Sequence, residues 1–284
     1  MQGKAQPVAI EFERAGLAYG KRTVWRDLSL EIEGGAFVAI LGPNGSGKTS
    51  LLRTVLGLVP LTSGRVTVLG SSPQRGNDAI GYIPQAHAFD PDLPVRGRDL
   101  VGLGLDGHRW GVSRPSAARR SRIDAAIEAA GATPFADVPV GRLSGGEQQR
   151  LRVAQALVAD PEILLCDEPL AHLDPRFQDE VTGLVGAWRR ATAGTVLFVT
   201  HDVNPILALV DRVLFVANGR WAAGTPDEIL TSQRLTELYG SHIDVLRVHD
   251  RVLVVGEESG SGFGVGEAHH GAGDEHDPSR GARR

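Results

Sequence analysis

A nine-residue, glycine-rich segment constrains this chain more than any other feature. It lies between the apolar run 37–41 and the run 51–56, and it consists of Gly42, Pro43, Asn44, Gly45, Ser46, Gly47, Lys48, Thr49 and Ser50. The pattern G-x-x-x-x-G-K-[ST] is typical of a phosphate-binding loop between a strand and a helix. Glycines let several N–H groups turn toward one anion, and a helix that begins near Lys48 adds its positive end.

The side chains that end this segment fit the same chemistry. Lys48 is placed to reach the β- and γ-phosphates of a nucleotide, and the Thr49 hydroxyl is placed to bind Mg²⁺. An ordinary glycine turn before a helix is the alternative that these residues alone leave open.

Composition narrows the class of protein. A chain of 284 residues with 42% apolar and 23% charged residues can bury a substantial core, in one large domain or two small ones. The net charge of −4 gives no reason to expect nucleic acid as a partner. A single cysteine, Cys166, excludes an intrachain disulfide. No signal peptide and no run of about 18 apolar residues is visible, so a role at a membrane needs another chain.

Strand patterns fill the first half of the chain. Residues 8–40 are predicted to form short strands, with Tyr19 on a loop between them. Tyr19 fits either an adenine-stacking residue or a half-buried tyrosine at a strand end. Residues 80–85 form another predicted strand, and Gln85 at its exit either contacts a nearby metal or water or is an ordinary surface residue.

The segment 86–142 changes character, because Gly, Pro, Arg and Ala dominate and helical patterns replace strands. It is predicted to be a helical insertion into an α/β domain. Its arginines are interpreted as a solvated face rather than a nucleic-acid patch, since acidic residues lie among them.

A second glycine-containing motif follows this insertion and opens a helix predicted to end near residue 159. Ser144 fits the N-cap and Glu147 completes a capping box. The consecutive glycines Gly145 and Gly146 lower helix stability, and capping does not require them. Close approach of an anion to the backbone amides would require two such glycines.

Acidic residues and a histidine follow two apolar runs that are predicted to be buried strands. The run 162–166 ends in Asp167 and Glu168, and the run 194–199 precedes His201. Asp167 can hold Mg²⁺ through water, and Glu168 can orient a water for attack on a γ-phosphate. His201 fits either a contact to that phosphate or a surface residue.

The C-terminal part is predicted to contain a hairpin over 212–220, one helix from Thr225 to about Tyr239, and a last hairpin over 245–255. Residues 257–284 carry almost no apolar side chains and are predicted to be disordered.

Taken together, these motifs resemble those of the ATP-binding subunits of ABC transporters over about residues 8–240. Residues 42–49 match Walker A, 143–147 the family signature, and 163–167 with Glu168 match Walker B and the catalytic glutamate. The remaining matches are Tyr19 to the adenine-stacking aromatic, Gln85 to the Q-loop, Asp174 to the D-loop and His201 to the switch histidine. His172 departs from the residue that the family often carries there, and it is left without a role.

The resemblance implies a fold and a domain organisation. The expected fold is an α/β P-loop NTPase (RecA-like) core with a small antiparallel β subdomain and an inserted α-helical subdomain at about 86–158. Residues 1–256 are expected to form the nucleotide-binding domain, and 257–284 a disordered tail rich in glycine, histidine and acidic residues.

The resemblance also implies a mechanism. Two copies would pair head to tail, and ATP would lie between Walker A of one copy and Ser144, Gly145 and Gly146 of the other. Thr49, Gln85 and Asp167 would hold Mg²⁺, while Glu168 and His201 would carry out hydrolysis. The dimer would drive a separate transmembrane permease from the cytoplasmic face of the membrane, together with an extracytoplasmic substrate-binding protein.

Two features favour a zinc- or manganese-type metal importer. Leu170 replaces the commoner threonine after Pro169, and the run 235–248 resembles the C-terminal part of that subfamily. His269, His270 and His276 of the tail could bind metal, although a loose histidine tail is more often inert. The alternatives are an ABC transporter for another substrate, a soluble ABC ATPase without a channel, and a small-molecule kinase.

Overall fold

The computed structural model describes residues 7–85, 88–107, 116–249 and 251–256. The predicted disordered tail and its three histidines lie outside the described residues. Within the described part, no helix combines the length and apolar character that crossing a bilayer requires.

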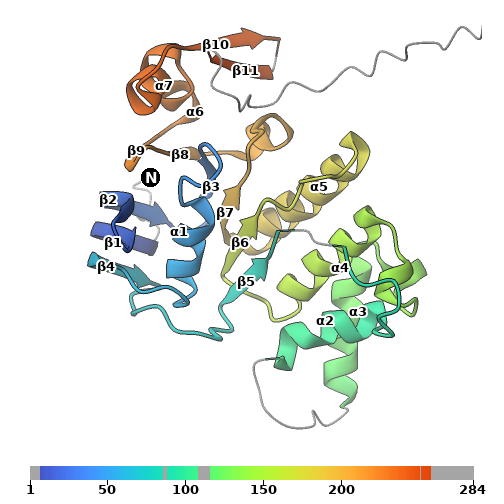
Figure 1. The fold of residues 1–284 in the computed structure, drawn as a ribbon. Coiled ribbons are helices and arrows are strands. Elements are labelled where there is room, and N and C mark those ends of the chain that lie inside the picture. The colour runs from blue at the N-terminus through green and yellow to red at the C-terminus, as the bar shows by residue number, and fades with distance from the viewer. Residues whose placement is uncertain (1–6, 86–87, 108–115, 250, 257–284) are drawn as a thin grey trace, which may run out of the picture.

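A six-stranded sheet forms the centre of the molecule (Figure 1). Its order is β5 (Ile80–Ile83), β6 (Ile163–Asp167), β7 (Thr195–Val199), β3 (Phe37–Leu41), β8 (Arg212–Ala217) and β9 (Arg220–Gly224). All neighbours are parallel except β8 and β9, which form an antiparallel hairpin. Every residue of β3, β6 and β7 is buried, which explains their continuous apolar runs. Because β3, β6 and β7 are parallel, their carboxyl ends meet at one edge of the sheet.

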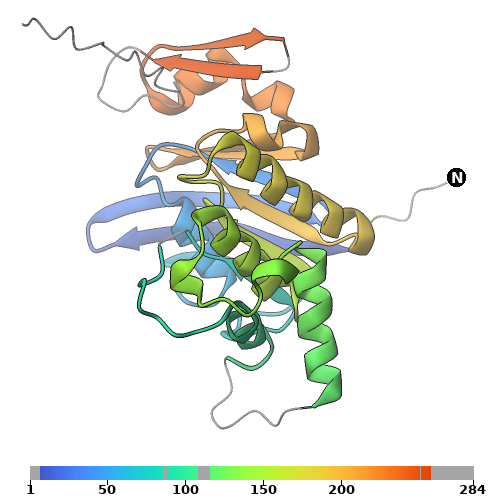
Figure 2. The same cartoon turned by 90° about the vertical axis from the view of Figure 1, so that its right-hand side faces the viewer.

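The two faces of the central sheet carry different layers. One face packs on helix α1 (Lys48–Val55) and on an antiparallel sheet of β2 (Arg22–Glu33), β1 (Val8–Tyr19) and β4 (Ser63–Val68). The other face packs on helix α5 (Pro175–Thr192), as Figure 2 shows from the side. Alternate strand residues serve the two layers, because Val38 points to the first core and Phe37 to the second.

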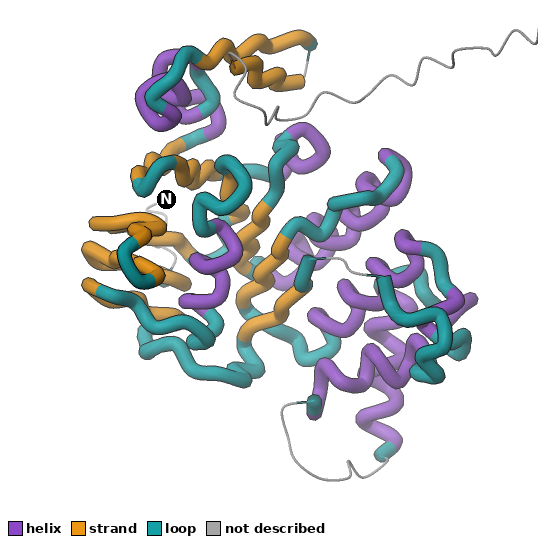
Figure 3. Tube along the Cα trace, viewed as in Figure 1, coloured by secondary structure: helices purple, strands orange, loops and turns teal. Residues whose placement is uncertain are grey.

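A group of helices has its own hydrophobic core beside the sheet (Figure 3). It contains α2 (Gly97–Asp106), α3 (Ala117–Ala129), α4 (Gly145–Leu157) and the 3-10 turns η1 (Thr133–Phe135) and η2 (Val140–Arg142). Its arginines pair with acids: Arg119 Nε lies 3.0 Å from Asp106 Oδ2, and Arg98 Nη1 lies 3.0 Å from Asp124 Oδ1. The Arg98–Asp124 pair is exposed, as predicted for a solvated face, whereas the Arg119–Asp106 pair is part-buried.

The C-terminal part contains the 3-10 turn η3 (Asn204–Leu209), helices α6 (Pro226–Ile229) and α7 (Ser232–Tyr239), and a hairpin of β10 (Ile243–Val248) and β11 (Arg251–Gly256). The prediction of one helix to Tyr239 is wrong. The chain leaves the helix at Leu230, and Thr231 caps a second helix by accepting a hydrogen bond from Arg234 N. The break lets both helices bury apolar side chains, Ile229 and Leu235 among them, in one core.

The prediction that Tyr19 lies on a loop is also wrong, because Tyr19 is the last residue of β1. Register shifts between β1 and β2 interrupt the alternation of apolar and polar residues, and Arg14 adopts a positive φ of 40° within the strand. Since the prediction depended on that alternation, it ended the strand too early.

Candidate functional site

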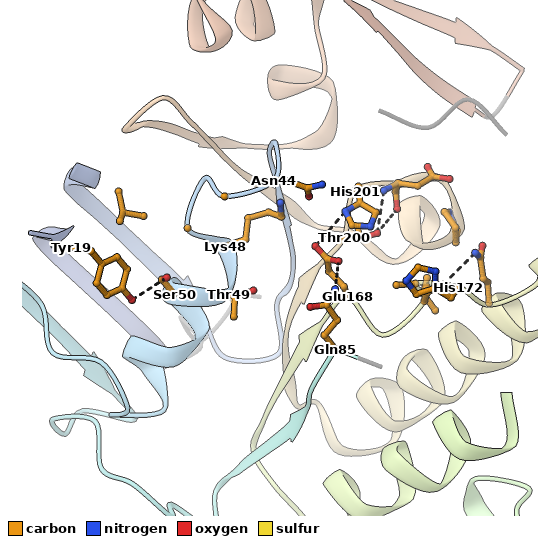
Figure 4. A pocket seen from close by; sticks show the side chains of 18 of the residues that line it. Tyr19, Asn44, Lys48, Thr49, Ser50, Gln85, Glu168, His172, Thr200 and His201 are labelled. Atoms are coloured by element: carbon orange, nitrogen blue, oxygen red, sulfur yellow. Dashed lines mark hydrogen bonds and ion pairs between the residues drawn. The ribbon is translucent and has the colours of Figure 1, made fainter. Parts of the chain in front are cut away.

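A cavity of about 800 Å³ opens where the carboxyl ends of β3, β6 and β7 meet. Both halves of the sequence supply its walls, as Figure 4 shows. The predicted site residues that line it are Tyr19, Asn44, Gly45, Gly47, Lys48, Thr49, Ser50, Gln85, Glu168 and His201. The fold therefore brings together residues from five separate motifs of the sequence.

Lys48 stands at the first turn of α1 with its ammonium turned back on the glycine-rich loop. Its Nζ donates to the carbonyl oxygens of Gly42 at 2.7 Å and Pro43 at 3.0 Å, and the residue is 5% exposed. Burial lowers the pKa of Lys48, while the nearby carboxylates of Glu168 and Asp167 act to raise it. A lysine held by carbonyls and facing two carboxylates can exchange these partners for phosphate oxygens.

Gly47 shows why the loop needs a glycine at this position. Its φ is 100°, and a Cβ atom there would lie 2.1 Å from Val24 Cγ1. The helix that follows has no side-chain cap at its N-terminus, so its first amides keep their hydrogen-bonding capacity for an anion. Ser46 is 9% exposed, and its Oγ has no hydrogen-bond partner in the described structure.

Thr49 and Asp167 form a compact oxygen site beside the loop. Thr49 Oγ1 donates to Asp167 Oδ1 at 2.9 Å, and Tyr82 OH donates to Asp167 Oδ2 at 3.3 Å. Burial raises the pKa of Tyr82 to about 12, with a further contribution from Asp167, so the phenol stays a donor. Sequence reasoning missed Tyr82. The feature that brings Tyr82 to the site is its strand, β5, which lies beside the strand of Asp167 in the sheet.

Glu168 is held between a glutamine and a histidine. Gln85 Nε2 donates to Glu168 Oε2 at 3.2 Å, and His201 Nδ1 lies 3.3 Å from Glu168 Oε1 (Figure 4). Glu168 has a positive φ of 50° and a side chain 12% exposed, whereas the His201 side chain is 42% exposed. A left-handed glutamate is strained, and such strain is common at functional sites.

The opposite wall of the cavity comes from the antiparallel sheet. Tyr19 is 50% exposed, and its OH donates to Ser50 Oγ at 3.3 Å. Arg22 Nη2 donates to the carbonyl oxygen of Gly45 at 2.9 Å and also lines the cavity. An exposed aromatic ring beside the loop can stack on a nucleotide base. Arg22 was not predicted, because an arginine at the start of a strand, here β2, carries no motif.

The predicted signature residues lie elsewhere. Ser144 caps α4 in a full capping box: its Oγ accepts from Glu147 N at 3.4 Å, and Glu147 Oε2 accepts from Ser144 N at 2.8 Å. Among the described residues that line the cavity, none belongs to this helix tip. The structure thus separates Ser144, Gly145 and Gly146 from the Lys48 side of the same chain.

The two signature glycines differ in their surroundings. A Cβ atom on Gly146 would lie 2.4 Å from Phe177 Cδ1, whereas one on Gly145 would meet only Leu173 Cδ2 at 3.9 Å. Packing against Phe177 therefore requires Gly146, which corrects the argument that only an approaching anion would need it. Gly145 has no such packing reason.

The loop after Glu168 carries the last predicted residues. Asp174 is exposed at the N-cap of α5, makes no side-chain cap hydrogen bond, and is not among the residues that line the cavity. His172 is exposed with a φ of 62° and does line the cavity. The structure thus brings His172 to the site, although the motifs assigned it no role.

Comparisons with known proteins agree with this geometry. A family model described as "ABC transporter" matches residues 25–171. The manganese transport system ATP-binding protein MntB of Bacillus subtilis (strain 168) is 33% identical over 249 residues, which cover 88% of this chain and 98% of that protein. The zinc transport system ATP-binding protein TroB of Treponema pallidum (strain Nichols) is 34% identical over 239 residues, covering 84% and 90%.

A further relative is named for export. The Nod factor export ATP-binding protein I of Cupriavidus pinatubonensis is 34% identical over 251 residues, covering 84% of this chain and 74% of that protein.

A solved structure gives the same picture of the fold. An inward-facing transporter described as of the metal-chelate type superposes with a TM-score of 0.75 at 26% identity, covering 89% of this chain and 99% of that chain.

The ABC ATPase domain binds ATP, and the relatives are ATP-binding subunits of transport systems. With the phosphate loop, Glu168 and His201 assembled around one cavity, the chain belongs to the ABC transporter family and is an ATPase subunit whose activity is coupled to transport.

Proposed function

We propose that this chain hydrolyses ATP as a homodimer with the catalytic roles divided among the residues of the cavity. Lys48 and the amides of residues 42–50 bind the phosphates, Tyr19 stacks on adenine, and Glu168 and His201 act on the terminal phosphate. The observation that carries the proposal is the convergence of Lys48, Glu168 and His201 on one cavity, with the buried Asp167 bound to Thr49 in its wall.

Mg²⁺ fits the oxygen site beside the loop. Thr49 Oγ1 and Asp167 Oδ1 are hard oxygen donors already 2.9 Å apart, and Gln85 lines the same cavity. Among the described residues, no group of three or more His, Cys, Asp or Glu could hold a metal ion. Phosphate oxygens would therefore complete the coordination. When bound, Mg²⁺ neutralises charge that develops on the transferring phosphate.

The chain's own residues account for water activation. The Glu168 carboxylate accepts a hydrogen bond from the attacking water and orients it toward the γ-phosphorus. His201 lies against the other side of that carboxylate and donates to the phosphate oxygens. Lys48 leaves the carbonyls of Gly42 and Pro43 and binds the phosphates, whose negative charge favours the protonated amine that burial disfavours.

The separation of the two helix ends supports the proposed dimer. Because Ser144 and Gly145 are exposed and lie away from the cavity of their own chain, they serve the cavity of a second copy. Asp174 at the N-cap of α5 contributes to that composite site. Residues 1–256 then form the nucleotide-binding domain, with the helical subdomain at about 86–158.

We infer that the transported substrate is a divalent metal ion such as zinc or manganese. The support is the match to MntB and TroB over most of both proteins. The dimer would work at the cytoplasmic face of the membrane with a separate permease and an extracytoplasmic binding protein. The test is uptake of radioactive zinc or manganese into vesicles that contain the reassembled transporter. ATP-dependent uptake is expected, and its absence for both metals would contradict the metal assignment.

A second substrate class is supported by one observation, the 34% identity to an ATP-binding protein for Nod factor export. In that case the same dimer would energise export of another substrate. The vesicle experiment separates the two, because an exporter gives no ATP-dependent metal uptake while its ATPase activity persists.

A further inference from the structure

The side chain of Asn204 joins the loop after β7 to the C-terminal hairpin. Its Oδ1 accepts from Val252 N at 2.8 Å, and its Nδ2 donates to Val252 O at 3.0 Å. In an antiparallel hairpin, alternate residues turn their N–H and C=O groups away from the neighbouring strand. The Asn204 amide therefore pairs with the outer edge of β11 as another strand residue would.

The same asparagine is tied to the residue that follows His201. Asp202 Oδ1 accepts from Asn204 N at 2.9 Å and from Asn204 Nδ2 at 2.7 Å. Asp202 in turn closes a turn with Thr200, since Thr200 Oγ1 donates to Asp202 O at 2.8 Å and accepts from Asp202 N at 3.2 Å. His201 lies inside this turn, so the hydrogen bonds of Asn204 and Thr200 fix the backbone on its C-terminal side.

The hairpin is anchored independently on its other edge. Thr236 Oγ1 accepts from Ile243 N at 3.0 Å, and Ser232 Oγ accepts from Val245 N at 2.8 Å. Side chains of α7 thus bind β10, while Asn204 binds β11. Val252 is 4% exposed and belongs to the core of the central sheet. Both strands of the hairpin are therefore hydrogen-bonded to the rest of the domain.

The C-terminal hairpin lies close to the loop that carries His201. A cavity of about 40 Å³ lies between them, lined by His201, Asp202 and Asn204 on one side and Val252 and Val254 on the other. His201 Nδ1 in turn lies 3.3 Å from Glu168 Oε1. A continuous series of contacts therefore runs from the C-terminal hairpin through Asn204 to the carboxylate of the site.

We propose that Asn204 is a positioning residue of the ATPase site, which holds His201 in place beside Glu168 by fixing its loop to the C-terminal hairpin. This inference rests on the proposed role of His201 in hydrolysis. It assigns the hairpin a function in catalysis, because the hairpin supplies the backbone groups that Asn204 binds.

The experiment measures kcat and KM for ATP of the purified chain with Mg²⁺. For N204A we expect kcat to fall about tenfold, with KM within about twofold, because the turn loses its support while the phosphate loop is untouched. N204D is nearly isosteric, yet it loses the donor to Val252 O and places a carboxylate beside Asp202, so the same loss is expected. If N204A fails to fold, N204D decides the result by these criteria.

The matched control is S232A, which removes an anchor on the other edge of the hairpin. It is expected to lower the melting temperature as N204A does and to leave kcat within about twofold. The decisive comparison uses H201A as the background. If Asn204 acts through His201, adding N204A to H201A changes kcat by less than about twofold.

Each outcome has one meaning. A normal kcat in N204A and N204D, while H201A is impaired, overturns this inference and leaves the proposed function standing. An undiminished tenfold loss when N204A is added to H201A also overturns it. A normal kcat in H201A overturns the proposed role of His201, and this inference with it.

Discussion

Two helix N-termini in this chain carry the motifs of one reaction, yet they are built differently. The N-terminus of α1 has no side-chain cap, and Lys48 beside it is 5% exposed within the cavity. The N-terminus of α4 is closed by its own capping box, and Ser144 is exposed outside the cavity lining. The amides at the N-terminus of α1 remain available to a ligand in the cavity. At the N-terminus of α4, the capping box already occupies the amides of Ser144 and Glu147. In the proposed homodimer, each end would supply one half of a composite site.

The largest expected effect tests the cavity itself. E168Q keeps the shape of the side chain and removes the proton acceptor, so hydrolysis should fall roughly 10²–10⁴-fold. ATP binding should persist, and the variant should dimerise when ATP is present. Phosphate release and gel filtration measure both effects. E162Q, an exposed change just before β6, is the control and should hydrolyse normally. Full turnover in E168Q would remove the main catalytic assignment.

The separation of the two helix ends can be tested by crosslinking. Cys166 is the only cysteine, it is buried, and burial raises the pKa of its thiol, so introduced cysteines react alone. With N44C and S144C in an E168Q background, ATP should produce a dimer band on a non-reducing gel, because the proposed head-to-tail dimer brings the two residues together across its interface. N44C with S241C, also exposed, is the control and should give none. An ATP-dependent band from the control pair alone would refute the head-to-tail arrangement.

The two signature glycines allow a test of packing against ligand approach. G146A should lower the free energy of unfolding by about 1–3 kcal/mol, because its Cβ would overlap Phe177. G145A should match or slightly exceed wild type, since alanine forms helices better than glycine. Urea denaturation measures both. F177L in the G146A background should recover part of the loss, and equal stability of the two glycine variants would show that the Phe177 contact is unimportant.

A smaller effect compares two capping boxes. Thr225 and Glu228 cap α6 just as Ser144 and Glu147 cap α4. T225A and S144A should each lower the free energy of unfolding by about 1 kcal/mol. Only S144A should also weaken ATP-driven dimerisation, because only that box lies at the proposed interface. Thermal melts and gel filtration with ATP give the two readings, and dimerisation that T225A weakens equally would end the distinction.

The smallest effect is a dependence on pH at the α6 box. Hydrogen bonds from the backbone and side chain of Thr225 lower the pKa of Glu228 from its ordinary value of 4.5. A folded-state pKa below the ordinary value stabilises the protein at pH values above that ordinary value. This contribution is lost as the pH falls through the folded-state pKa. The stability difference between wild type and E228Q should therefore shrink between pH 7 and about pH 3. A difference that grows on acidification would contradict this sign.

Most of the site could be predicted from sequence because its motifs are local. The loop 42–50 and the acids after residues 163–166 each lie at the end of an apolar strand, and parallel strands bring such ends together. Tyr82 and Arg22 could not be found this way. Their contacts to Asp167 and Gly45 depend on which strand lies beside which, and no short motif records that.

The family, the α/β class, the phosphate loop and the capping box of α4 were determined by the sequence alone, since each depends on motifs of residues within a few positions of one another. The break at Leu230, the length of β1, the contact of Gly146 with Phe177 and the pairing of Asn204 with Val252 were decided by tertiary structure. Each of these depends on a partner that is distant in sequence or on a register shift, and local pattern carries no information about either.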